Sequence, residues 1–271
     1  MNHEQSPATY QFILYEVKDG IARLTLNQPN KLNAFHLPMY GEICDALDAA
    51  SLDEAVRVII IKGAGRAFSA GRDFKFSADL QTERGISAWR RGYKGFSRST
   101  SSNLKLIIAQ VHGYALGGAG TLALLSDLTF AAAGTKFGYP ETRHGIASKT
   151  MMWSWTLGLK VANEVVASGR LVTADECKHL RLVNEVLPAD LLEPYVEAVA
   201  RRIADAPEGV PELIKRTVNW AIRDQIRVTQ QDRAFDVDTA HWDAAGVEPS
   251  DWMLNAYKAR RAALMSLVDD D

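Results

Sequence analysis

One carboxylate and one glycine-rich turn are the residues of this chain whose types and spacing best suit chemistry. The turn, Gly117-Gly118-Ala119-Gly120, follows an apolar strand-like run at 106–111 and precedes a run of helical length that begins at Thr121. A strand, turn and helix start of this kind directs backbone N–H groups at one point, where the helix dipole reinforces them. The arrangement suits a developing oxyanion or a phosphate. Glu141 follows, and a carboxylate close to an anion hole suits proton transfer.

Composition narrows the class of protein. The chain has 271 residues, of which 47% are hydrophobic, so it is long enough for one large domain or one domain with an extension. The net charge of −2 argues against a nucleic-acid-binding surface. Six histidines are scattered without cysteine or carboxylate partners at ligand spacing, so we expect no metal site. The chain also lacks the glycine fingerprint of a dinucleotide site.

The cysteines and the N-terminal residues indicate a cytoplasmic protein. Cys44 and Cys177 fall inside helical patterns and are expected to be buried thiols, which suits a reducing compartment. The first ten residues, MNHEQSPATY, lack the basic and apolar regions of a signal peptide. No apolar run approaches the roughly 20 residues of a membrane span, so we expect no membrane partner.

The apolar pattern predicts a layered α/β fold followed by helices. Alternation around Asp19-Gly20 predicts a hairpin, and Thr173 with Glu176 predicts a helix capping box. The strands expected from the pattern lie at 10–17, 21–26, 56–61, 106–111, 128–133 and 182–187. The helices expected lie at 37–50, 149–157, 162–168, 174–180, 191–206, 210–227, 228–245 and 251–268. Strands separated by helices in the first two thirds favour the α/β class.

Six motifs, in order and spacing, identify the chain as similar to the crotonase, or enoyl-CoA hydratase/isomerase, superfamily over about residues 10–265. They are 27–34 (NQPNKLNA), 67–73 (AFSAGRD), 112–120 (HGYALGGAG), 137–141 (FGYPE), 169–174 (GRLVTA) and 182–186 (LVNEV). The resemblance implies a spiral of ββα units in residues 1–200. It also implies a helical C-terminal part, 201–271, that covers the core and makes trimer contacts. It further implies an acyl-CoA thioester substrate, a homotrimer or dimer of trimers, and no metal or redox cofactor.

The resemblance also implies roles for individual residues. The backbone N–H groups of Arg72 and Gly118 correspond to the family's oxyanion hole, and Glu141 corresponds to a family acid/base. A thioester enolate carries negative charge on oxygen, so two fixed donors would lower the barrier by about 3 kcal/mol each. The residues that match the loops that bind CoA are Lys31, Leu32, Ala34, Ala70 and Asp73.

Thr121 is the departure that matters, because the similar hydratases carry a second glutamate there. A threonine hydroxyl is no general base near pH 7, although it can hold a water or a substrate hydroxyl. Three interpretations stay open: isomerisation of an enoyl-CoA by Glu141 alone, hydration that tolerates Thr121, and hydration followed by cleavage of an aromatic enoyl-CoA. The last resembles hydroxycinnamoyl-CoA hydratase-lyases, which have a serine at this place. Their phenol-holding tyrosine has no clear counterpart at 234–236. A hypothesis of another class is a non-catalytic scaffold with the same fold.

Three further residues near these motifs have competing interpretations. His144 can titrate near neutral pH and is a candidate second acid or base, or else a structural histidine held by a backbone carbonyl. His112 is expected to brace the turn before Gly113 rather than to act in chemistry. Tyr139 is expected to serve packing.

Overall fold

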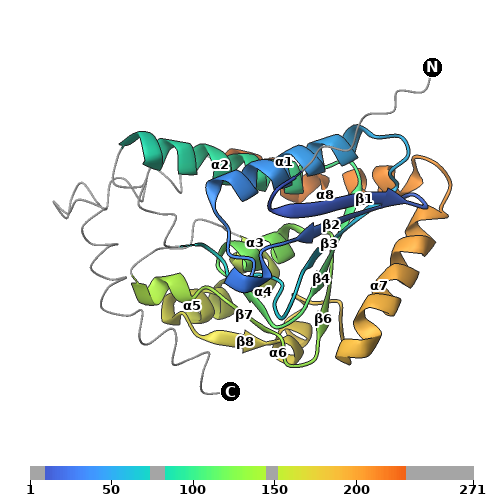
Figure 1. Ribbon diagram of the computed structural model, residues 1–271. Coiled ribbons are helices and arrows are strands. Elements are labelled where there is room, and N and C mark those ends of the chain that lie inside the picture. The colour runs from blue at the N-terminus through green and yellow to red at the C-terminus, as the bar shows by residue number, and fades with distance from the viewer. Residues whose placement is uncertain (1–9, 74–82, 145–151, 230–271) are drawn as a thin grey trace.

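A six-stranded sheet forms the centre of the protein, which is known from a computed structural model that describes residues 10–73, 83–144 and 152–229 (Figure 1). The strand order is β1-β2-β3-β4-β6-β9, with β1 antiparallel to β2 and the other neighbours parallel. These strands are β1 Ile13–Lys18, β2 Ile21–Leu26, β3 Val58–Gly63, β4 Leu106–Val111, β6 Leu128–Ala132 and β9 Glu185–Leu187. The expected α/β class is confirmed.

The first hairpin turns where the sequence predicts it. Asp19 and Gly20 both have positive φ, 53° and 76°, which is the conformation that a two-residue hairpin turn requires. Lys18 therefore pairs directly with Ile21. The hairpin places β2 beside β3 and so starts the parallel part of the sheet.

The strands predicted at 10–17 and 182–187 begin later than expected, because side chains take over the backbone pairing there. The backbone N–H groups of Gln11 and Phe12 donate to the Glu42 carboxylate, so β1 begins at Ile13 rather than at residue 10. The strand expected at 182–187 begins at Glu185. Before it, the Asn184 side chain accepts a hydrogen bond from the Thr129 N–H, while Leu182 and Val183 donate to a helix carbonyl.

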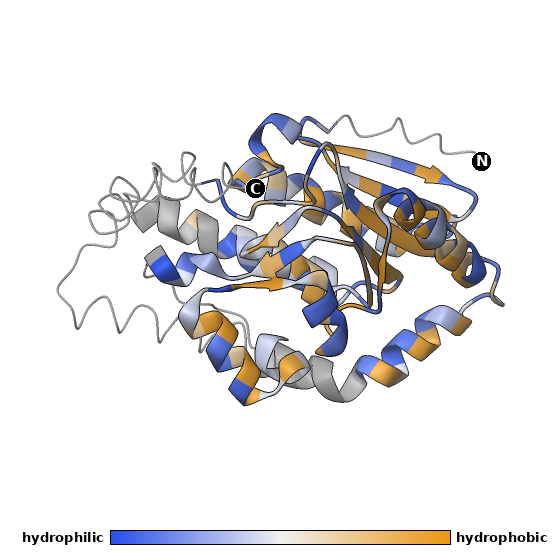
Figure 2. Ribbon diagram, turned by 90° about the horizontal axis from the view of Figure 1, so that it is seen from below, coloured by the Kyte–Doolittle hydropathy of each residue, from blue (hydrophilic) through white to orange (hydrophobic). Residues whose placement is uncertain are grey.

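The sheet is covered on both faces, and β3 shows how one strand serves both. Ile59 and Ile61 belong to the core beneath α1 and α2, whereas Val58 and Ile60 belong to the core beneath α7. The helices over these faces are α1 Leu37–Leu52, α2 Glu83–Ser101, α3 Gly118–Leu125 and α7 Ala189–Ala204 (Figure 1). The strands are apolar along most of their length, while the helices alternate apolar and polar residues (Figure 2). Burial of both sheet faces explains the β-branched runs in the sequence.

A small second sheet lies beside the first and carries the turn of interest. It contains β5 Tyr114–Leu116, β7 Lys136–Gly138 and β8 Leu171–Thr173, in the order β5-β7-β8. The short elements around it are η3 Pro140–His144, α4 Met152–Leu157, α5 Leu159–Ser168 and α6 Ala174–His179. The predicted cap of α6 is confirmed, because the Thr173 hydroxyl accepts a hydrogen bond from the Glu176 N–H at 3.2 Å.

The last described helix, α8 Val210–Thr229, is held to the end of the sheet by a buried ion pair. Lys215 Nζ lies 2.6 Å from Asp127 Oδ2 and donates to the backbone oxygen of Lys105. The helices predicted at 228–245 and 251–268 fall almost entirely outside the described residues, as do 149–151. The expected division at residue 200 falls within α7 and stays a prediction.

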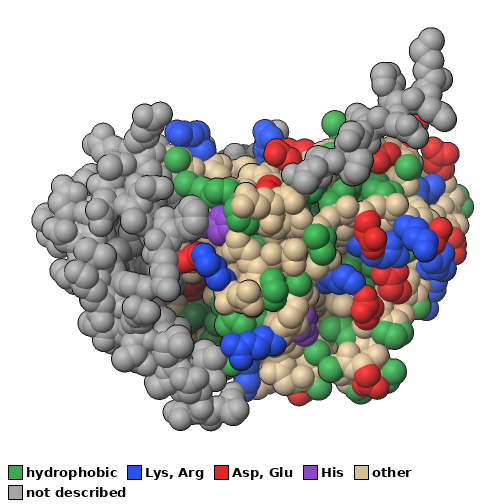
Figure 3. Space-filling view, in the orientation of Figure 1, with side chains coloured by type: hydrophobic (Ala, Val, Ile, Leu, Met, Phe, Trp, Pro, Cys, Tyr) green, Lys and Arg blue, Asp and Glu red, His purple; other side chains and the backbone are tan. Residues whose placement is uncertain are grey.

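Three surface and chemical features complete the described part. Acidic and basic side chains are intermixed where α7 covers the sheet (Figure 3). The two cysteines, Cys44 and Cys177, are free thiols, and Cys177 is buried. Among the described residues, no helix has the length and apolar character needed to cross a membrane.

Candidate active site

Two of the sequence motifs, 27–34 and 67–73, lie side by side. The Ala70 N–H donates to the Leu32 carbonyl at 2.9 Å. The Phe35 N–H donates to the Gly71 carbonyl at 2.6 Å, and the Asp73 N–H donates back to Phe35 at 2.8 Å. These bonds make a short ladder that fixes the backbone at Arg72, one of the two expected oxyanion donors.

Asn33 holds the first of these loops in place. It is fully buried and has φ of 52°, a left-handed conformation that asparagine tolerates better than most residues. Its side-chain nitrogen lies within 3.1 Å of the carbonyl oxygens of Ala64, Ala67 and Phe68. Its side-chain oxygen accepts from the Gln28 N–H. The loop that carries the expected CoA-binding residues is therefore built around one buried amide.

The second loop is joined to the strand that leads into the glycine turn. The Ser69 N–H donates to the Tyr114 carbonyl, and the Leu116 N–H donates back to Ser69. A Cβ atom added at Gly71 would lie 2.6 Å from the Leu116 oxygen, so only glycine permits this approach. His112 braces the same region as expected, because its Nε2 lies 2.9 Å from the Gly65 carbonyl.

Glu141 lies at the point where these segments converge. A Cβ atom added at Gly117 would lie 1.5 Å from Glu141 Oε1, and one added at Gly71 would lie 3.3 Å from it. Gly117 also has φ of 53°. Gly118 begins α3, so its N–H has no carbonyl partner within the helix. The carboxyl group thus contacts the residues that immediately precede both expected oxyanion donors, Arg72 and Gly118.

Burial makes the Glu141 carboxyl a weak acid. Its residue is 6% exposed, and burial raises the pKa of Glu141 to about 7 from an ordinary 4.5. A hydrogen bond from its own backbone N–H and the Arg72 charge act in the opposite direction. Within the described residues, Glu141 Oε2 is buried without a hydrogen-bond partner. A carboxyl group with a pKa near 7 can both take and give a proton at neutral pH.

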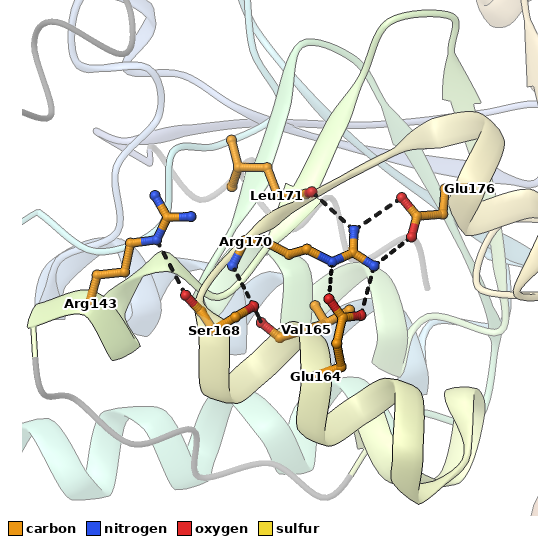
Figure 4. A network of polar contacts seen from close by, with 7 residues as sticks. All are labelled: Arg143, Glu164, Val165, Ser168, Arg170, Leu171 and Glu176. Carbon is orange, nitrogen blue, oxygen red and sulfur yellow. Dashed lines mark hydrogen bonds and ion pairs between the residues drawn. The ribbon is translucent and has the colours of Figure 1, made fainter.

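A polar network supports the short helix η3 that carries Glu141. Arg143 donates to the Ser168 carbonyl at 3.4 Å, and its side chain packs where Gly169 leaves room (Figure 4). Next to it, the Arg170 guanidinium binds both Glu164 and Glu176, with Nη2 to Glu176 Oε1 at 2.6 Å. This network ties η3 to α5 and α6 and so fixes the direction from which Glu141 enters the site.

Three tyrosines belong to the same region as Glu141, and the sequence gives little sign of their role. Tyr40 is buried on α1, and its hydroxyl lies 2.9 Å from where a Cβ atom would stand on Gly118. Tyr93, on α2, stacks edge-on against Tyr40 with ring centroids 6.4 Å apart. Tyr139 precedes η3. Burial raises the pKa of all three phenols, and the Glu141 charge raises each further.

Arg72 also brings a side chain to this cluster, in addition to its backbone N–H. Its Nε and Nη2 atoms are buried. Burial lowers the pKa of the Arg72 guanidinium, while the nearby Tyr40, Tyr139 and Glu141 act to raise it. The site therefore combines one weak acid with one cation and three phenols. Tyr139 was expected only to pack, but its phenol interacts electrostatically with Arg72 and Glu141.

Thr121 lies one helical turn after Gly117, in the position where similar hydratases carry a glutamate. It is 1% exposed, and its hydroxyl donates to the Gly117 carbonyl at 3.3 Å. Its side chain also forms a hydrogen bond with Tyr93, which lowers the pKa of that phenol against the larger effect of burial. His144 ends η3, but its side chain lies outside what the structure describes, and so do residues 145–151.

The expected CoA-binding residues lie on the two paired loops. Lys31 is exposed, and its Nζ forms an ion pair of 3.1 Å with Asp73, whose side chain is largely buried. Leu32, Ala34 and Ala70 are each partly exposed along the same ladder. The structure thus brings all five together, although a CoA-binding role for them stays a prediction.

This geometry defines a class of site, in which a buried weak acid lies beside backbone amides at a helix start. Comparison with known proteins gives the family. A sequence model described as Enoyl-CoA hydratase/isomerase matches residues 16–248. The chain is 32% identical over 242 residues to a crotonyl-CoA hydratase of Syntrophomonas wolfei, covering 88% of this chain and 90% of that protein. It is 34% identical over 184 residues to a 2,3-dehydroadipyl-CoA hydratase of Escherichia coli, covering 67% and 71%.

Solved structures agree with the sequence comparisons. An enoyl-CoA hydratase/isomerase from Xanthobacter autotrophicus Py2 superposes with a TM-score of 0.81 at 32% identity, covering 94% of this chain and 99% of that one. A probable enoyl-CoA hydratase from Mycobacterium smegmatis gives 0.80 at 31% identity, covering 87% and 97%. The chain belongs to the enoyl-CoA hydratase/isomerase family, and it is an enzyme of the type that acts on acyl-CoA thioesters.

Proposed function

We propose that Glu141 moves a proton beside the thioester carbonyl of an enoyl-CoA, while the N–H groups of Arg72 and Gly118 hold the enolate oxygen. The observation that carries the proposal is the Glu141 carboxyl, which is buried against Gly117 and Gly71 and whose Oε2 lacks a partner among the described residues. A buried acceptor costs free energy unless a ligand satisfies it. The hydrogen of a substrate or a water would do so.

The chemistry follows from one acid/base group acting twice. For isomerisation, the Glu141 carboxylate removes a proton from the carbon between the carbonyl and the double bond, and the carbonyl becomes an enolate. The protonated Glu141 then returns the proton at the γ-carbon. For hydration, the carboxylate removes a proton from water as its oxygen bonds to the β-carbon, and the same proton then goes to the α-carbon. No metal or redox group enters either route.

The proposal is tested by Glu141→Gln, which keeps the shape and removes the acid. We expect the exchange of α-hydrogens of butyryl-CoA with deuterium oxide, followed by NMR, to fall at least ~100-fold, as does crotonyl-CoA hydration. In the unchanged protein, the exchange rate should rise about tenfold per pH unit below pH 7 and level off above it, because the pKa of Glu141 is about 7. Unchanged exchange in the variant would remove Glu141 from the mechanism.

The reaction catalysed and the oligomeric state both stay predictions. Incubation of the protein with 2-enoyl, 3-enoyl and feruloyl-CoA esters, followed by mass spectrometry of the products, would distinguish isomerisation, hydration and hydratase-lyase cleavage. Residues 234–236, which the hydratase-lyase comparison concerns, lie outside the described part.

A homotrimer or dimer of trimers is the expected assembly, which light scattering of the purified protein would test. Family membership favours an enzyme over a non-catalytic scaffold.

A further inference from the structure

Thr121 stands in the place of the second family glutamate, and its hydroxyl group has the Tyr93 phenol as a partner. Thr121, on α3, and Tyr93, on α2, form a side-chain hydrogen bond. Helix α2 packs against both α1 and α3, and Tyr93 contacts Tyr40 and Phe96 with ring centroids 6.4 Å away in each case. The position of the phenol is therefore set by three helices.

Gly117 connects Thr121 to the acid. The Gly117 carbonyl accepts from Thr121, and the Cα of the same glycine contacts the Glu141 carboxyl. Burial and the Glu141 charge both raise the pKa of the Tyr93 phenol. Oε2 of the same carboxyl group has no hydrogen-bond partner among the described residues, so it can accept a hydrogen bond from a water.

We propose that Tyr93 and Thr121 together hold the water that adds to the β-carbon of a 2-enoyl-CoA, and so replace the second carboxylate as its positioning group. A hydroxyl group both donates and accepts, so the pair can orient a water without itself gaining or losing a proton. Water gives one proton to Glu141 and its oxygen bonds to the β-carbon, while Tyr93 and Thr121 keep their own protons. This inference rests on the proposed role of Glu141 and assigns the reaction to the hydration class.

The test separates water addition from proton transfer in one protein. Tyr93→Phe removes one oxygen atom and keeps the ring contacts with Tyr40 and Phe96. We expect its kcat for crotonyl-CoA hydration to fall at least ~10-fold with KM changed less than about threefold, because a misplaced nucleophile lowers the rate more than it lowers binding. Exchange of the butyryl-CoA α-hydrogens, which needs no added water, should stay within about twofold of the unchanged protein.

Tyr195→Phe is a matched control. Tyr195 lies on α7, and its ring contacts Phe130 on the other face of the sheet. It should change neither reaction. Equal losses of hydration and exchange in Tyr93→Phe would overturn the inference, as would unchanged hydration or a wild-type protein that adds no water. Glu141→Gln tests the proposed function separately from the further inference. If this variant keeps the exchange of α-hydrogens, the proposed function is wrong, whatever the result for Tyr93→Phe.

A second variant tests the pairing and covers the case in which Tyr93→Phe folds poorly. Thr121→Val keeps the buried shape and removes the hydroxyl, and it should lower hydration relative to exchange in the same way. If both groups hold one water, the double variant should lose little more hydration than the worse single variant. Losses that multiply would show that the two residues act separately and would overturn the joint role.

Discussion

The two faces of the central sheet are built from the same strands but differ in what they bury. Under α1, α2 and α3 the core adjoins buried polar groups, among them Asn33, Thr121 and Glu141. Under α7 the core is apolar, and its charged residues form ion pairs at the edge, such as Arg23 with Glu197. Buried polar groups cost free energy, and the face under α1, α2 and α3 contains them because proton transfer requires an acid that is held in place away from water. The face under α7 contributes only to the stability of the sheet.

Replacement of Asn33 should have the largest effect on stability. Asn33→Ala leaves the carbonyl oxygens of Ala64, Ala67 and Phe68 without this donor and places alanine at a positive φ. We expect the free energy of unfolding to fall by about 4 kcal/mol, since a buried unsatisfied group costs about 1–3 kcal/mol. Urea denaturation measures this change.

The matched control for that experiment is Asn163→Ala, because Asn163 is exposed on α5. Its unfolding free energy should stay within about 0.5 kcal/mol of the unchanged protein. A similarly small loss in Asn33→Ala would mean that the paired loops of the site do not depend on the buried amide. The buried polar groups of the face under α1, α2 and α3 would then contribute less to stability than their burial implies.

Glu141→Gln should stabilise the protein while it removes activity. The folded-state pKa of about 7 lies above the ordinary 4.5, so the folded protein binds this proton more tightly than the unfolded chain does. Stability therefore falls as pH rises from about 4.5 to about 7 and then stays level. The variant lacks this loss, so it should gain about 3 kcal/mol at pH 8 and little at pH 4.5.

Urea denaturation of both proteins at the two pH values checks the sign. A variant that is less stable than the unchanged protein at pH 8 would mean that Glu141 is charged and well satisfied in the folded state. The environment of Glu141 would then resemble that of the ion-paired residues at the edge of the α7 face rather than a site without water.

The α7 face should give the smallest effect. Glu197 binds Arg23 through two hydrogen bonds, of 2.7 and 2.6 Å, and both side chains retain some exposure. Glu197→Gln should lower the unfolding free energy by about 1 kcal/mol, and less in 1 M NaCl, since solvent and salt screen such pairs. The rate of acyl-CoA turnover should not change. A loss of activity in this variant would contradict the separation of the two faces.

Local sequence patterns predict much of the fold and the backbone part of the site. Alternation and β-branched runs predict the strands, and the family resemblance of the motifs that hold Gly71, Gly117 and Glu141 implies segments that the structure brings together. Gly71 and Gly117 have this predictive value because each marks a place where another part of the chain comes close to the backbone.

The aromatic part of the site could not be predicted in this way. Tyr40 and Tyr93 occupy apolar faces of amphipathic helices, where a phenol has the same pattern as any core residue. Their hydroxyl groups come close to Gly118 and Thr121 only because α2 packs against both α1 and α3. The role of Asn33 is also hidden, because the three carbonyl oxygens that it binds lie more than 30 positions further along the chain.

The contact between Gly117 and Glu141 means that these two positions cannot change independently. The added Cβ of even an alanine would share space with Glu141 Oε1, at 1.5 Å, so a side chain at 117 expels the acid from the site. A descendant that kept the fold but gave up the reaction would be free to fill position 117. A residue larger than glycine at position 117 would therefore mark a relative in which Glu141 does not occupy this place.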